Sequence, residues 1–96
     1  MVASENRAEV IRVLLLEALQ AEHVEVHDDS GQHLGHVGAA AGGGHYRVLV
    51  VSRRFVGLSR LAAQRLVYRA LGTLLERDIH AVQIRTLTPD SWRSRE

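Results

Sequence analysis

The stretch HYRVLVVSRRFVGLSRLAAQRLVYRAL, residues 45–71, decides the fold of this 96-residue chain. Residues 45–51 are rich in β-branched and apolar side chains, and Ser52 ends the run, so we predict a strand. Val48 and Val50 share one face of that strand, because successive side chains alternate between its two faces. The same stretch continues into a turn and then a helix.

Phe55, Gly57 and Leu58 mark the turn, and Ser59 after it is suited to cap a helix N-terminus. Apolar residues then recur at helical spacing, which predicts an amphipathic helix to about Glu76. They are Leu66, Val67, Ala70, Leu71, Leu74 and Leu75.

Upstream of this stretch, the sequence predicts a helix, a short strand and a loop. Asn6 followed by Glu9 has the form of a capping box, and apolar residues at helical spacing predict a helix over residues 7–21. HVEVH, residues 23–27, alternates as a half-buried strand that would pair with residues 45–51. Residues 28–44 contain six glycines and no apolar period, so we predict a long loop, and loops of this length are usually functional or mobile.

Downstream, IHAVQIRTL from Ile79 alternates as a third strand. Thr88 is expected to cap a short helical turn that starts at Pro89, with Trp92 packing back on the domain. The element order predicts an α+β fold, αββαβ, in which two helices pack on one face of a three-stranded sheet. We expect one domain over residues 1–96, with residues 1–5 and 93–96 frayed.

The composition narrows the possible functions. The chain has no cysteine, so histidine and carboxylate are the strong metal ligands that remain. No segment reaches the roughly 18 apolar residues of a membrane span, so we expect no membrane association and a cytoplasmic location. The sequence shows no nucleophile elbow, P-loop or paired catalytic carboxylates, and we therefore do not expect an enzyme.

Charge is segregated along the chain. Residues 1–29 hold seven acidic side chains and two arginines, whereas residues 30–75 hold six arginines and no acid. These arginines could bind phosphates or an acidic partner, or could form an ordinary solvated surface. They are Arg47, Arg53, Arg54, Arg60, Arg65 and Arg69. Nucleic-acid binding is not favoured by the pattern, since the chain has no GxxG loop of the KH kind and only four aromatic residues.

Several motifs together resemble the BolA family. They are Ser30 with His33, the strand from His45, FVGLSR from Phe55, RLVY from Arg65, IHAV from Ile79 and TPDSW from Thr88. Their order and spacing over residues 24–92 are specific, although each motif alone is weak. The resemblance implies a fold like that of a type II KH domain.

The resemblance also implies an adaptor that binds a monothiol glutaredoxin and shares a 2Fe-2S cluster with it and its glutathione. Such an adaptor would act in iron-sulfur cluster assembly, transfer or iron sensing. The implied ligands are His80 of the HA motif and a loop histidine, either His33 or His36, with His45 less favoured. We expect no cofactor in the isolated protein, which would be a monomer or a weak homodimer. Without the resemblance, His80 would be read as a structural strand histidine.

Two other functions stay open at this point. The family resemblance also allows a DNA-binding transcriptional regulator of stress response and cell morphology, which would use the arginine-bearing second helix and its preceding turn. The second of these functions is that of an interaction module that docks a partner without a cluster. The chain departs from the family at Ala63 and Gln64, where members usually carry arginine and histidine, and this departure weakens any role that depends on those two groups.

Overall fold

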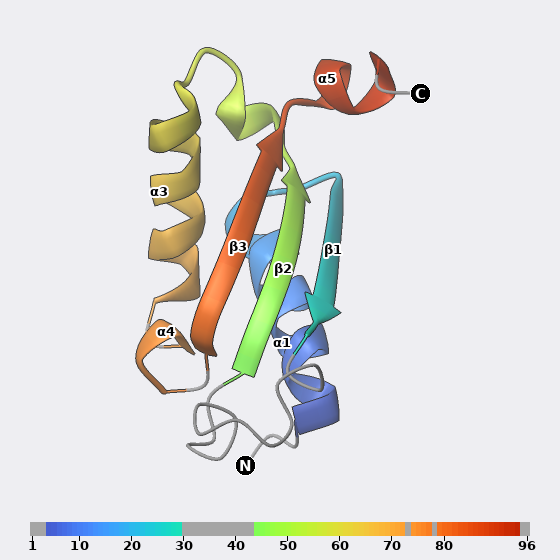
Figure 1. The fold of residues 1–96 in the computed structure, drawn as a ribbon. Helices are drawn as coiled ribbons and strands as arrows, with labels where there is room; N and C mark the ends of the chain where they lie inside the picture. Colours follow the sequence, from blue (N-terminus) through green and yellow to red (C-terminus); the bar gives the residue numbers. More distant parts are fainter. Residues whose placement is uncertain (1–3, 30–43, 73, 78, 95–96) are drawn as a thin grey trace.

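The computed structural model describes residues 4–29, 44–72, 74–77 and 79–94 of the chain. Its elements follow the predicted order, including the short helix that starts at Pro89, with one additional short helix and a 3-10 turn (Figure 1). They are α1 (Ser4–Ala18), β1 (His23–Asp28), β2 (Gly44–Val51), η2 (Arg53–Phe55), α3 (Arg60–Leu71), α4 (Leu74–Arg77), β3 (Ile79–Leu87) and α5 (Pro89–Ser94). No helix in these ranges is long and apolar enough to cross a membrane.

The three strands form one sheet in the order β1-β2-β3, with β2 in the centre. β1 pairs antiparallel with β2, with Val24 opposite Val50, and β3 pairs parallel with β2, with Val48 opposite Ile84. Parallel neighbours need a crossover connection, which α3 and α4 supply. β1 and β3 are therefore the two edge strands.

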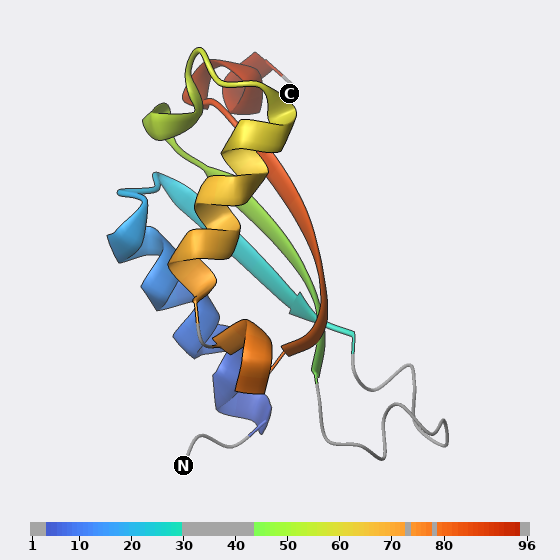
Figure 2. The same cartoon turned by 90° about the vertical axis from the view of Figure 1, so that its left-hand side faces the viewer.

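Both long helices cover the same face of the sheet, and the opposite face is open (Figure 2). The core lies between these two layers, and the predicted α+β arrangement is confirmed. Alternate residues of β2 point into the core, whereas Arg47 between them is exposed. The main core side chains are Ile11 and Leu15 from α1, Tyr46, Val48 and Val50 from β2, and Val67 and Leu71 from α3.

The first helix spans Ser4–Ala18, so the predicted bounds of 7–21 are wrong at both ends. Asn6 lies inside the helix and not at its cap, and Glu9 forms an ion pair with Arg12 one turn later. At the other end, Gln20 adopts a φ of 50°, and the Ala21 N–H donates to the Leu16 carbonyl at 3.1 Å. This left-handed residue and its closing hydrogen bond end the helix before residue 21.

The second long helix ends at Leu71, so the prediction that it continues to Glu76 is also wrong. Gly72 has φ 51° and ψ −126°, a conformation suited to glycine, and its N–H donates to the Tyr68 carbonyl at 3.1 Å. The apolar period continues into Leu74 and Leu75 because these residues form the separate short helix α4, which packs on the same core.

Hydroxyl side chains cap the N-termini of α3 and α5, as the sequence predicts. Ser59 accepts a hydrogen bond from the Ala62 N–H at 3.1 Å at the start of α3. Thr88 accepts one from the Ser91 N–H at 3.2 Å at the start of α5. The ring of Trp92 stacks on that of His23 with centroids 4.6 Å apart, which confirms that α5 packs back on the sheet.

Candidate functional site

His80 lies in a bulge at the start of β3. Gly44 pairs with Ile79 and His45 pairs with Ala81, so β3 has one more residue than β2 at this point, and His80 is the extra one. A bulge locally bends a strand and redirects the residue that it inserts. The backbone of His80 therefore lies beside the first two residues of β2, at the end of the sheet where both strands begin (Figure 1).

His45 lies at the same end of the sheet, on the strand next to His80. Its side chain is partly buried, and its Nε2 atom is shielded from solvent. The Asp29 N–H donates to the His45 carbonyl at 2.7 Å, so Asp29 after β1 is held at this end too. Asp29 and Gly44 are the described residues on either side of segment 30–43. Both ends of the predicted loop therefore lie near the start of β3.

Two of the predicted ligands, His33 and His36, lie outside the described residues, as does the side chain of His80. Within the described part of the chain, no group of three or more histidine or carboxylate side chains could hold a metal ion. The structure thus locates the His80 backbone and His45, and the ligand set stays a prediction.

Of the six arginines of the predicted surface, Arg47 lies on β2 and the other five are divided among three places. Arg53 and Arg54 lie in η2 beside the end of α1, where Arg54 Nη1 donates to the Ala18 carbonyl at 3.1 Å. Arg65 and Arg69 are exposed and four residues apart on α3, so they share one helix face. Arg60, at the first turn of α3, lines a hollow beside β3.

The two positions where the chain departs from the family have structural roles. Ala63 is buried in the core with 3% of its surface exposed. The side-chain amide of Gln64 donates from α3 to the Ile84 carbonyl of β3 at 3.2 Å. Gln64 therefore links the helix to the main chain of an edge strand.

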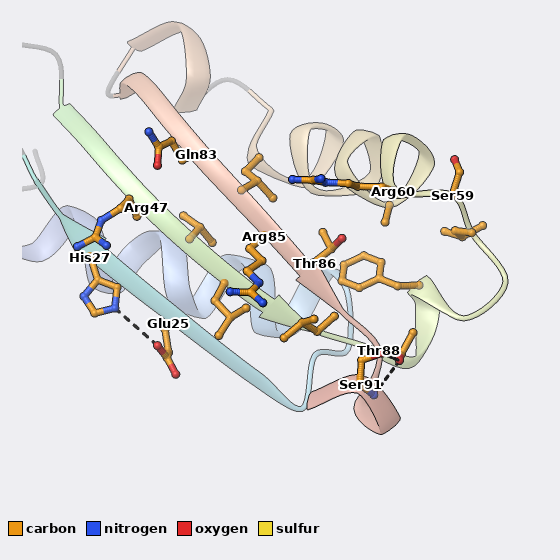
Figure 3. Close-up of a pocket in the computed structure, with 17 residues that line it drawn as sticks. Glu25, His27, Arg47, Ser59, Arg60, Gln83, Arg85, Thr86, Thr88 and Ser91 are labelled. Atoms are coloured by element: carbon orange, nitrogen blue, oxygen red, sulfur yellow. Dashed lines mark hydrogen bonds and ion pairs between the residues drawn. The ribbon is translucent and has the colours of Figure 1, made fainter. Parts of the chain in front are cut away.

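The hollow has a volume of about 1220 Å³ and extends from the open face of the sheet to the start of α3 (Figure 3). Arg47, Gln83 and Arg85 line it from the sheet, and Ser59 and Arg60 line it from α3. Gln83 and Arg85 are not among the functional residues predicted from the sequence. Their signal was the alternation of IHAVQIRTL, which places both on the face opposite Val82 and Ile84.

A carboxylate with two histidine neighbours lies on the β1 side of this hollow. Glu25 Oε2 is 2.7 Å from His23 Nε2. On the other side, Glu25 Oε1 is 3.6 Å from His27 Nε2, the contact drawn in Figure 3. The hydrogen bond from His23 is the main cause that lowers the pKa of the Glu25 carboxyl, and His27 lowers it further. Arg47 is engaged separately, because its Nε donates to Asp29 at 2.6 Å.

Comparison with known proteins identifies relatives over most of the chain. Residues 15–91 match the family described as BolA-like protein. BolA-like protein 1 from Mus musculus is 43% identical over 83 residues, which are 86% of this chain and 58% of that protein. The chain thus spans less than two thirds of that relative's length. The DNA-binding transcriptional regulator BolA from Vibrio cholerae is 36% identical over 85 residues, covering 88% of this chain and 77% of that protein.

Solved structures with a similar fold belong to the same family. The structure of BolA1 from Arabidopsis thaliana superposes with a TM-score of 0.76 at 35% identity, covering 92% of this chain and 97% of that one. Sequence and fold agree, and the chain belongs to the BolA family.

Proposed function

We propose that this protein is an adaptor that binds a monothiol glutaredoxin and ligates a shared 2Fe-2S cluster through His80 and a histidine of segment 30–43, either His33 or His36. The observation that carries the proposal is the bulge that inserts His80 beside Gly44, the residue where that segment re-enters the sheet. One imidazole on β3 and one on the adjoining segment would then approach the same iron from neighbouring parts of the chain.

The residues at this end of the sheet suit the cluster in their donor chemistry. The chain has no cysteine to supply thiolate, and imidazole nitrogen is a ligand that replaces thiolate in such clusters. Histidine in place of thiolate on one iron raises the reduction potential of a 2Fe-2S cluster. His45 is partly buried on β2 and pairs with Ala81, the residue after His80, and it stays the less favoured ligand in the proposal.

Co-expression with a monothiol glutaredoxin tests the proposal through the visible absorption and circular dichroism spectra of the purified complex. The wild-type pair should differ from the glutaredoxin homodimer in both spectra. His80→Ala should return the spectra to those of the homodimer, and one of the single changes His33→Ala or His36→Ala should have the same effect.

His27→Ala is the matched control, because His27 is an exposed strand histidine on β1, and this change should leave the spectra of the complex unaltered. Spectra of the His80→Ala complex identical to those of the wild type would overturn the proposal.

DNA binding is the second candidate, and the observation that favours it is the name of the Vibrio cholerae relative. Binding to DNA through the arginines would be salt-dependent, since it replaces counterions on phosphates. A clear preference for one duplex sequence over random DNA at a fixed salt concentration would support this function, and weak binding that is uniform across sequences would refute it.

A further inference from the structure

The outer edge of β3 presents main-chain N–H and C=O groups that form no hydrogen bonds with β2. The Ser52 N–H donates to the Leu87 carbonyl at 3.0 Å, so the carbonyl of Leu87 points toward β2. Backbone groups of successive residues point to opposite sides of a strand, and those of Val82, Ile84 and Thr86 therefore point away from β2. β3 is an edge strand in the sheet order, so these three residues form its outer edge.

One acceptor on this edge already binds an amide donor. The Ile84 carbonyl accepts a hydrogen bond at 3.2 Å from the side-chain amide of Gln64, which reaches it from α3. An amide of the main chain of another strand would approach in the same way. This carbonyl can therefore be reached by an N–H donor, and the Gln64 side chain has to move aside before an added strand can pair with it.

Positive charge flanks the edge on both sides. Arg85 rises from β3 on the open face of the sheet, and Arg60 extends from α3 on the other side of β3 (Figure 3). Among the side chains that the structure describes, no carboxylate forms an ion pair with either arginine. Glu25, the acidic residue lining this hollow, is bound to His23.

We propose that the edge of β3 from Val82 to Thr86 pairs with an extended acidic segment of a partner protein, which lies in the hollow between Arg60 and Arg85. Strand addition supplies main-chain hydrogen bonds, and side chains that alternate between the two faces supply specificity. Two neighbouring acidic residues on the added strand would point to opposite faces, one toward Arg85 and the other toward Arg60.

The same hollow is poorly suited to single-stranded nucleic acid. Such binding relies on exposed aromatic rings on which bases stack. The aromatic residue that lines the hollow is Phe55, and only 4% of its surface is exposed. The charge pattern together with the edge position of β3 therefore points to a peptide.

The probe for the test is a fluorescein-labelled peptide, TVEEVET, added to the full chain. Fluorescence anisotropy should show saturable binding, and backbone amide NMR signals of Val82, Ile84 and Thr86 should shift while those of β1 do not. Arg85→Glu and Arg60→Glu should each weaken binding about tenfold, since each change places like charges together. Arg69→Glu, on another face of α3, is the matched control and should change the affinity less than about twofold.

A second peptide separates strand pairing from charge attraction alone. The same sequence, N-methylated at alternate amides, keeps its charge but cannot donate the hydrogen bonds of a strand, so it should not bind. Equal binding of both peptides would overturn the proposal, as would binding of oligothymidine at the same arginines without binding of the peptide. The peptide is added to the chain alone, with no glutaredoxin and no cluster present, so the result does not depend on cluster binding.

Discussion

Ser52 connects three parts of the structure although it is a single small side chain. It is fully buried, its hydroxyl donates to the Leu19 carbonyl at 2.8 Å, and it accepts from the Arg54 N–H at 3.1 Å. The end of α1, the end of β2 and the start of η2 are thereby held together.

Replacement of this hydroxyl should destabilise the fold. We expect Ser52→Ala to lower the free energy of unfolding by about 1–3 kcal/mol, because a buried carbonyl loses its donor. Urea denaturation measures the change through the midpoint at constant slope. Ser94→Ala, on an exposed position of α5, should change it by less than about 0.5 kcal/mol. An equal effect of the two changes would show that the buried hydrogen bond is not important.

Glu25 should make stability depend on pH in the acid range. The His23 hydrogen bond lowers the pKa of the Glu25 carboxyl below its ordinary value of 4.5, so folding favours the ionised form. The stabilisation is therefore present above that value and is lost as pH falls through the lower pKa of the folded state. Glu25→Gln should lower the free energy of unfolding by about 0.5 kcal/mol near pH 5, as expected for a solvent-exposed ion pair.

The check is to measure urea unfolding of wild type and Glu25→Gln in parallel. The difference between them should shrink as the pH is lowered from about 5 toward about 2.5, because the carboxyl then becomes protonated in both states. A difference that stays constant or grows over this range would contradict the assignment.

At the scale of single elements, Gln20 after α1 adopts a left-handed backbone conformation that glycine would fit better. Gln20 has a φ of 50°, a region where a side chain beyond glycine is strained. We expect Gln20→Gly to raise the free energy of unfolding by about 0.5–1 kcal/mol. Gln20→Ala keeps the Cβ atom and should give no such gain. Thermal unfolding of the three proteins would measure this, and a loss of stability in Gln20→Gly would refute it.

The ends and irregularities of elements were harder to predict than the elements themselves. The strand from Ile79 was evident from its alternation, but the bulge at His80 depends on how β3 aligns with β2, which the strand's own residues do not encode. The end of α3 was also hard to predict. Leu74 and Leu75 continue the apolar period of α3 because they pack on the same core, but they belong to α4, since Gly72 ends α3.

At the scale of the whole molecule, stability depends on one core between the helices and the sheet. Leu15 of α1 is fully buried in it, and Leu61 of α3 is 58% exposed. Leu15→Ala should lower the free energy of unfolding by about 2–5 kcal/mol. This is a large part of the roughly 5–15 kcal/mol typical of a domain. Leu61→Ala should cost less than about 0.5 kcal/mol in the same urea titration. Similar losses in both variants would contradict a single core on one face of the sheet.

The sequence by itself determined the order of the main elements and the caps at Ser59 and Thr88. These features depend on side-chain periodicity and on hydrogen bonds between residues near in sequence, so they can be read locally. His33, His36 and His80 as cluster ligands stay a prediction from the family motifs.

Only the tertiary structure decided which distant residues meet. It placed His80 in a bulge beside Gly44, joined Gln64 to the Ile84 carbonyl, and separated Arg60 from Arg65 while bringing it to the same hollow as Arg85. The physical reason is that strand register and helix packing are set by the burial of the whole core. Side chains far apart in sequence become neighbours as a consequence of that packing and not of their own local pattern.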